Sequence, residues 1–470
     1  MVTIVEKGTR KSKREVSQAE PVPIFHSRGE RIAAGRSLRE SVPRSKHAAW
    51  KPSAKRRDPI DILEESNQDR LPELVPIRYG RMLASPFTFL RGSAGLMAHD
   101  LATTPNTGVR VQACGDCHLL NFGLFATPER NLVFDINDFD ETLPAPWEWD
   151  IKRLAVSFVI AGRDNRLTDA ENREVVRECG RAYRERLREY SRMSPLEIWY
   201  TRLDAETLIA TAPDEEAKKR RQRYAEKARQ RVVENLFPKI ASRAGGRHRL
   251  VDQPPLLFHI AEPDFEQRVR ESLAIYRESL SDERRTLLDR YRLEDFALKV
   301  VGIGSVGTHC FIGLFFDQEN HPLMLQVKEA GRSVLEPYAG KSRYNNQGQR
   351  VVIGQRLMQS SSDIFLGWTS GRKGHDFFVR QLRDMKMSIP VEGATGEQLK
   401  RYAGICSWTL ARAHAKSGDA ATISGYLGKG ETFDQALGEF SLLYADQTEK
   451  DHAALIKAVR SGRVQAIVEE

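Results

Sequence analysis

The sequence has no long hydrophobic run and little cysteine. No apolar stretch approaches the ~18 residues of a membrane-spanning helix, and the opening MVTIVEKGTRKSKREV contains no apolar segment of signal-peptide length. Five cysteines in 470 residues are too few and too scattered for a disulfide framework. These absences exclude the membrane-spanning and disulfide-stapled classes. They predict a cytoplasmic protein without a membrane partner.

Positive charge is concentrated at the N-terminus, where large apolar residues are few. Residues 1–57 contain 15 Lys and Arg and five Glu, a net charge of +10, whereas the whole chain carries +9. The rest of the chain is therefore nearly neutral. This composition predicts a basic, disordered arm over residues 1–57 that makes at most weak contact with nucleic acid or an acidic surface. A solvated tail is favoured, because beyond Trp50 little aromatic interleaving is available for base stacking.

Residues 109–141, VRVQACGDCHLLNFGLFATPERNLVFDINDFDE, concentrate polar residues next to apolar strands. A β-branched run at 109–111 leads into GDCHLLN at 115–121, and a strand at 132–136 leads into NDFD at 137–140. Taken singly, each polar group is typical of an ordinary turn or acidic loop. Their combined order and spacing favour a phosphotransferase-like site.

Three residues of this stretch suit magnesium-assisted phosphoryl transfer. That chemistry requires a carboxylate near the acceptor hydroxyl, an oxygen ligand for the metal, and a second carboxylate that holds metal against the phosphates. Asp116, Asn121 and Asp138 would supply these groups in that order. The step of five from Asp116 to Asn121 matches the catalytic aspartate and metal-binding asparagine of protein kinases. Asp140 is a candidate second metal ligand.

The same letters contain a rival pattern. Cys114, Cys117 and His118 fit C-x-x-C-H, which is typical of c-type haem attachment, and the two cysteines fit a dithiol redox motif. Haem attachment requires export, which the N-terminus does not support. Two small buried thiols flanking Asp116 are the favoured interpretation.

The pattern changes to strands at residue 296. An apolar run at 296–301 enters GIGSVG at 302–307, HCFIGLFF follows at 309–316, and a further strand, LMLQVKEA, carries Lys328. A dinucleotide-binding G-x-G-x-x-G opens a helix, whereas here a second strand follows. The order predicts a loop whose backbone at Gly302, Gly304, Ser305 and Gly307, together with Lys328, holds nucleotide phosphates. An ordinary hairpin with an exposed lysine is the alternative.

One part of the kinase pattern is missing. The helix expected at 348–359, GQRVVIGQRLMQ, contains no glutamate to orient Lys328, so that role would fall to Glu329, Glu336 or Gln355. Strands are expected at 362–368 and 377–382. The prediction for this region is a five-stranded sheet with one helix.

The motifs resemble those of known phosphotransferases. GDCHLLN resembles the Gly-Asp-x-His-x-x-Asn loop of aminoglycoside and choline phosphotransferases, NDFDE resembles their Ile-Asp-Phe-Glu metal site, and PWEWDIKRLA resembles the helix whose aspartate, here Asp150, braces the loop. This resemblance implies ATP and Mg²⁺ as cofactors, with Asp116, His118 and Asp150 as the catalytic set. The catalytic loop at residue 116 precedes the nucleotide lobe, which begins near residue 296, and this is the reverse of the usual kinase order. The resemblance therefore implies a circularly permuted, two-lobed protein-kinase-like α+β fold.

Nearly the whole chain after residue 57 resembles the bacterial family known as domain of unknown function 2252. This resemblance implies no particular substrate. The predicted organisation is a helical large lobe (58–294), a small β-rich nucleotide lobe (295–395) and C-terminal helices on the large lobe (396–470). Only eleven residues separate Asp138 from Asp150, too few for a protein-kinase activation segment. The expected function is therefore phosphoryl transfer to a small hydroxylated molecule. An inactive nucleotide-binding regulator and adenylate transfer are the alternatives.

Overall fold

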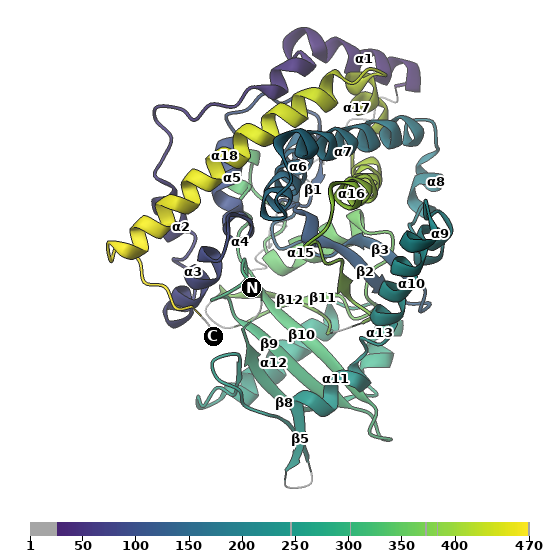
Figure 1. The fold of residues 1–470 in the computed structure, drawn as a ribbon. Coiled ribbons are helices and arrows are strands. Elements are labelled where there is room, and N and C mark those ends of the chain that lie inside the picture. Colours follow the sequence, from purple (N-terminus) through teal and green to yellow (C-terminus); the bar gives the residue numbers. More distant parts are fainter. Residues whose placement is uncertain (1–25, 245–246, 301, 372–373, 383, 469–470) are drawn as a thin grey trace, which may run out of the picture.

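The computed structural model describes residues 26–244, 247–300, 302–371, 374–382 and 384–468. The chain is a mixed α+β protein with antiparallel sheets, so the predicted α+β class is confirmed. Most helices gather in the upper part of Figure 1, here called the helical body (residues 26–231 and 384–468). A six-stranded sheet with its own helices lies below and is called the sheet unit (residues 233–382).

Four long helices form the centre of the helical body: α6 (Trp147–Asp164), α7 (Asp169–Tyr190), α16 (Gly396–Ser417) and α18 (Thr432–Arg460). α6 is buried along nearly its whole length, because its second half, LAVSFVIAG, is apolar on every side. α16 and α18 pack on α6 and α7. Within the described residues, no helix combines the length and apolar character that crossing a bilayer requires.

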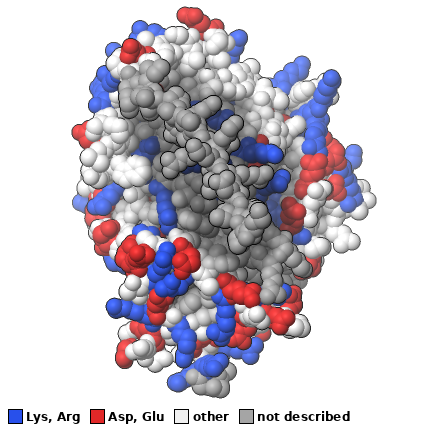
Figure 2. All heavy atoms as spheres, turned by 180° about the vertical axis from the view of Figure 1, so that it is seen from behind, with Lys and Arg blue, Asp and Glu red and all other residues white. Residues whose placement is uncertain are grey.

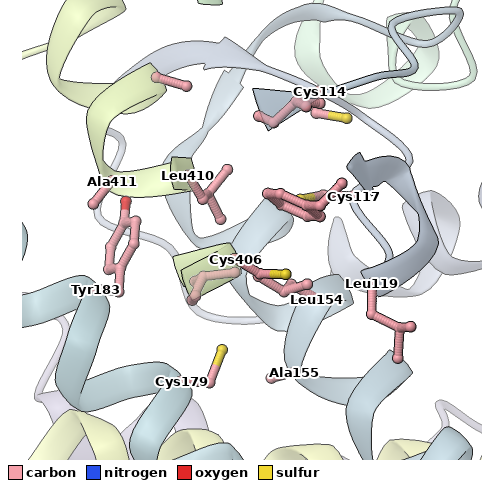
Figure 3. Close-up of a cluster of buried hydrophobic side chains, with 14 of the residues drawn as sticks. Cys114, Cys117, Leu119, Leu154, Ala155, Cys179, Tyr183, Cys406, Leu410 and Ala411 are labelled. Atoms are coloured by element: carbon pink, nitrogen blue, oxygen red, sulfur yellow. The ribbon is translucent and has the colours of Figure 1, made fainter. Parts of the chain in front are cut away.

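The cysteines belong to the core of the helical body. Cys114 and Cys117 lie among Leu119, Leu154 and Leu410 in Figure 3, and all five cysteines are buried and unpaired. Burial raises the pKa of both the Cys114 and Cys117 thiols, although for Cys114 the opposing hydrogen bond from Cys117 is the largest single influence. The favoured interpretation of two buried thiols is therefore confirmed.

The N-terminal segment is more ordered than predicted. Helix α1 (Arg28–Ser41) begins at a capping box formed by Ser27 and Glu30 and packs along α17 (Ala420–Leu427). Gly35 permits this packing, because a Cβ at this position would lie 1.9 Å from the carbonyl oxygen of Thr422. The prediction of a disordered arm is wrong for residues 28–48, and residues 1–25 lie outside the described part of the chain.

The sheet unit is built on six strands in the order β11-β12-β10-β9-β8-β7. The central strands are β8 (Arg292–Lys299), β9 (Cys310–Phe316) and β10 (Pro322–Ala330), which are antiparallel neighbours as the predicted strand–loop–strand order requires. β12 (Asp376–Gln381) pairs with β10, and β11 (Gly367–Ser370) with β12. The short strand β7 (Leu257–Phe258) adds to β8, so the predicted five strands are corrected to six.

Both faces of this sheet are covered, because the strands alternate apolar residues on two sides. Phe311 and Phe315 of β9 face Tyr276 of α12 (Phe265–Glu278), whereas Ile312 and Leu314 belong to the cluster that includes α11 (Val233–Ile240). The segment 233–294 therefore packs with the sheet. The predicted boundary at residue 294 is wrong, since the apolar faces of these helices are buried in the same clusters as the sheet strands.

The chain enters and leaves the sheet unit at adjacent points. The backbone N–H of Met385 donates to the carbonyl oxygen of Arg231, with an N···O distance of 2.9 Å. The sheet unit, residues 233–382, is therefore one continuous segment of the chain that is inserted into the helical body between these two points.

The remaining elements are short. The helices are η1 (Arg44–Ala48), α2 (Pro59–Glu65), η2 (Pro72–Leu74), α3 (Val75–Leu83), α4 (Pro86–Gly92), α5 (Ala94–Leu101), η3 (Leu119–Asn121), α8 (Pro195–Tyr200), α9 (Ala205–Ala210), α10 (Glu215–Arg229), α13 (Asp282–Leu288), α14 (Glu336–Ala339) and α15 (Gln347–Met358). The strands are β1 (Arg110–Ala113), β2 (Phe122–Ala126), β3 (Leu132–Ile136), β4 (Leu143–Pro146), β5 (Ala241–Ala244), β6 (Arg247–Leu250) and β13 (Met387–Ser388). On the face drawn in Figure 2, acidic and basic side chains are interspersed over the lower part of the molecule.

Candidate functional site

The predicted site residues converge on one cavity of about 300 Å³ between the helical body and the sheet unit. The loops that follow β1 and β3 bring Asp116 and Asp138 to its wall, and these loops touch where Cys114 Sγ lies 3.3 Å from the Asp138 carbonyl oxygen. Residues 302–305 of the glycine loop and the end of β10 also line the cavity. The wall residues among the predictions are Asp116, His118, Asn121, Asp138, Asp140, Gly302, Gly304 and Ser305.

Asp116 accepts a hydrogen bond from an arginine that was not predicted from the sequence as a site residue. The Nε of Arg153, in α6, donates to Oδ1 of Asp116 at 2.6 Å, and Arg153 also donates to the Leu90 carbonyl oxygen. Burial raises the pKa of Asp116, and the Arg153 charge opposes that rise. Arg153 lies one helical turn after Asp150, and this i, i+3 spacing is the signal that could have identified it.

Asp150 makes the contact expected of a bracing residue. Its carboxylate accepts the backbone N–H groups of Cys114 and Gly115 at 2.6 and 3.0 Å. His414 of α16 approaches the same carboxylate at 3.2 Å, and Tyr183 holds the other ring nitrogen of His414. Asp150 is fully buried and does not line the cavity, so it positions the loop and does not touch a ligand.

Asn121 and His118 complete this loop. The Asn121 side-chain amide donates to the backbone carbonyl oxygen of Asp116, which leaves its own oxygen for another partner. His118 is 4% exposed, and its Nδ1 has no hydrogen-bond partner among the described residues. Burial, followed by the charges of Arg91 and Arg153, lowers the pKa of His118. The ring is therefore neutral at physiological pH.

Asp138 and Asp140 meet a lysine from the other side of the cavity. The Nζ of Lys328, on β10, lies 2.6 Å from Oδ2 of Asp140. Burial alone would raise the pKa of Asp138, but the charges of Lys328, Arg380 and Lys386 hold it well below its ordinary value. The same carboxylates raise the pKa of Lys328 against the effect of burial. Burial and the charge of Asp138 raise the pKa of Asp140, and the charge of Lys328 opposes that rise. The site therefore holds the negative charge of Asp138 close to the positive charge of Lys328.

The glycine loop closes over this pair. The Ser305 hydroxyl lies 3.2 Å from Oδ2 of Asp140. Gly302 and Gly307 have φ angles of +67° and +88°, which a residue with a side chain rarely adopts. The backbone N–H of Leu71 donates to the Gly307 carbonyl oxygen at 2.7 Å, so the loop is anchored to the helical body. Gly307 supports the turn but does not line the cavity.

Lys328 has a different partner from the three predicted ones. Glu329 hydrogen-bonds His309 and His375, Glu336 accepts the Ser342 backbone N–H, and Gln355 donates to Gln359. Asp140 pairs with Lys328 instead. The prediction of Glu329, Glu336 or Gln355 as the orienting residue is therefore wrong.

Helix α15 contributes a buried arginine to the loop that carries Asp138 and Asp140. Arg350 is 2% exposed and donates to the carbonyl oxygens of Asp140, Thr142 and Gly331 at 2.7–2.9 Å. It joins the carboxylate loop to the end of β10. The sequence around Arg350 did not predict this buried position, because a lone arginine in a helix usually lies on the solvated side.

Glu141 follows these carboxylates and predicts a pH effect on stability. Burial raises its pKa from 4.5 to about 7, so the folded state favours the neutral acid. The stability that this preference gives is present at low pH and is lost as the pH rises toward 7. We expect Glu141→Gln to remove this loss, so that the variant gains up to about 3 kcal/mol on the wild type between about pH 5 and pH 8.

Urea denaturation at several pH values would measure this gain. Glu189→Gln, which changes a carboxylate whose side chain is 49% exposed, is the control and should follow the wild type. Parallel pH profiles for Glu141→Gln and the wild type would contradict the assignment.

The residues around the cavity fit magnesium and a nucleotide. Asp138, Asp140 and Asn121 offer carboxylate and amide oxygens, the ligands that Mg²⁺ prefers. Oδ1 of Asp140 is buried without a hydrogen-bond partner among the described residues, which suits a ligand atom. Lys328 and the glycine loop suit phosphate oxygens.

Fold and site together define an α+β protein with an acidic cleft between a helical body and an antiparallel sheet. The chain belongs to the family domain of unknown function 2252, described as an uncharacterized protein conserved in bacteria, whose model matches residues 70–458. The predicted membership is thus confirmed. No curated protein and no solved structure matches the chain.

Proposed function

We propose that the protein is an ATP- and magnesium-dependent phosphotransferase of a circularly permuted, two-lobed kinase-like type. The observation that carries the proposal is the meeting of Lys328 with the Asp138–Asp140 loop. These segments are 188 residues apart in sequence, yet Lys328 Nζ and Asp140 Oδ2 lie 2.6 Å apart at the cavity that also holds Asp116. A lysine, a glycine loop and paired carboxylates around one cleft are the groups that phosphoryl transfer uses.

Each group has a distinct role in this proposal. Asp138, Asp140 and Asn121 hold magnesium, and Lys328 with the backbone of residues 302–305 holds phosphate oxygens. Bound Mg–ATP supplies the phosphoryl group. Asp116 orients the acceptor hydroxyl and receives its proton, while Arg153 fixes the orientation of the Asp116 carboxylate.

Further positive groups support an anionic ligand. Arg91 lines the cavity, and its Nε has no hydrogen-bond partner among the described residues. The N-terminus of α5 faces the same space without a side-chain cap and adds backbone N–H groups. A small hydroxylated acceptor is favoured, because the eleven residues between Asp138 and Asp150 leave no long segment to dock a protein substrate.

The test is incubation of the full chain with ATP, magnesium and metabolite extract, followed by mass spectrometry. We expect ADP together with a phosphorylated metabolite, and Asp116→Asn should reduce turnover at least about 100-fold while ATP binding persists. Asp169→Asn, at an exposed ion pair on α7, is the matched control and should retain activity.

Other products would identify the alternatives. AMP and pyrophosphate would indicate adenylate transfer. Tight ATP binding with turnover unchanged by Asp116→Asn would contradict catalysis at this site and favour a nucleotide-binding regulator.

A further inference from the structure

A second cluster of ligating side chains lies at the same end of the sheet but on its other face. One ring nitrogen of His309, one of His375 and one carboxylate oxygen of Glu329 all lie within 4.8 Å of one another. Within the described residues, this trio satisfies the spacing that a metal ion needs. His309 and His375 lie outside the proposed phosphotransferase site, whereas Glu329 also reaches the wall of its cavity.

The sheet register builds this trio. Residues 309, 329 and 375 come from the start of β9, the end of β10 and the turn before β12, and β10 lies between the other two strands. Glu329 directly follows Lys328, so the two side chains point to opposite faces of β10. Lys328 faces the acidic cleft, whereas Glu329 faces the side where His309 and His375 border an apolar cavity.

Glu329 already holds both rings in place. Its Oε2 accepts Nδ1–H of His309 at 2.7 Å and its Oε1 accepts Nδ1–H of His375 at 2.6 Å. The backbone N–H of His309 donates to the same carboxylate at 2.9 Å. The ring centroids lie 5.2 Å apart, so the three side chains are held together before an ion binds. A metal ion bound between the ring nitrogens and the carboxylate would displace the two bridging protons, which are released to solvent.

We propose that His309, Glu329 and His375 form a binding site for Zn²⁺ or a similar first-row transition metal. Two imidazoles with one carboxylate suit such ions, whereas Mg²⁺ and Ca²⁺ prefer oxygen ligands alone. Three protein ligands leave a fourth position open, as in sites that bind water or a ligand. The side chains of His309 and His375 are 26% and 37% exposed, so an ion can enter from solvent.

An apolar cavity with aromatic walls lies beside the proposed metal site. Tyr276, Phe296 and Phe311 line that cavity together with the two histidines. A bound metal ion would also link β9, the strand that follows the glycine loop, to β10 and β12. Binding should therefore raise the melting temperature of the protein even without nucleotide.

The test is equilibrium dialysis of the tag-free full chain against Zn²⁺ without nucleotide, with metal content measured by mass spectrometry. We expect one Zn²⁺ per chain, a rise in melting temperature, and visible absorption of a tetrahedral kind when Co²⁺ replaces zinc. His375→Ala, at the more exposed ligand, should weaken binding at least about 100-fold, because loss of a ligand costs more than loss of a ligand's supporting partner. His309→Gln is a second variant with the same expectation.

His321→Ala is the matched control, since His321 is 72% exposed and pairs with Asp317. It should bind zinc as the wild type does. The proposal would be overturned if the folded wild type bound no zinc, or if the His375→Ala and His309→Gln variants bound zinc as tightly as the wild type does. Because the measurement contains no ATP, its outcome is independent of the phosphotransferase proposal.

Discussion

Asp138→Asn is expected to reduce magnesium-dependent turnover at least about a thousandfold. The substitution removes the carboxylate charge that would hold the metal, but preserves size and one oxygen. Lys328, Arg380 and Lys386 surround this carboxylate and remain charged or basic in the variant. ATP is an anion, so its binding in the absence of metal should persist or tighten while its dependence on magnesium disappears.

Calorimetric titration of ATP with and without Mg²⁺, beside turnover, would measure both effects. Asp384→Asn provides a control at a half-buried carboxylate outside this group, which is paired with the exposed Arg130. If Asp138→Asn kept its magnesium dependence, Asp138 would not be a metal ligand.

Arg412→Met is expected to reduce the free energy of unfolding by about 3–5 kcal/mol. Arg412 on α16 donates to both carboxylate oxygens of Asp135 on β3 at 2.6 and 2.8 Å, and the two side chains are 3% and 1% exposed. Removal of the guanidinium leaves the Asp135 charge buried, with only Ser360 as its remaining side-chain partner among the described residues. Urea or thermal denaturation would show the loss.

Two comparisons isolate the cause of this loss. Arg173→Met removes an exposed partner of Glu439 and should cost less than about 1 kcal/mol. The double variant Asp135→Asn, Arg412→Met should be more stable than Arg412→Met, because it no longer buries an unpaired charge. A loss under about 1 kcal/mol for Arg412→Met would contradict a dominant role for this ion pair.

Local sequence patterns predicted the strands that deliver the site. The strand at 132–136 coincides with β3, and the strand–loop–strand order around 302–307 matches β8 and β9. These features depend on residues close together in sequence, such as apolar alternation and glycine at positive φ. The contact of Asp150 with the loop at residues 114–115 was also expected, from the resemblance.

The pairing of side chains across the cleft could not be derived in this way. Lys328 meets Asp140, Arg350 holds the loop after Asp138, and Glu329 turns away toward two histidines. Each contact depends on how two distant segments pack, and the sequence contains no local record of it. Alternation along β10 was the one usable signal, since it places Lys328 and Glu329 on opposite faces.

Composition misled the prediction for the N-terminus. Charge and few large apolar residues predicted disorder, whereas α1 forms because Gly35 permits close packing on α17. A capping box at Ser27 and Glu30 was present in the sequence and marks a helix start. Because α1 packs on α17 through small residues, its sequence shows no hydrophobic periodicity from which the contact could be predicted.

The adjacent crossings at Arg231 and Met385 have a consequence for synthesis on the ribosome. The sheet unit is contiguous, so all of its strands emerge before α16 begins. The core of the helical body draws side chains from α6 and α7 and from α16 to α18, and it stays incomplete until the last helices emerge. The N-terminal half of the body must therefore wait, with apolar faces uncovered, while the sheet unit is translated.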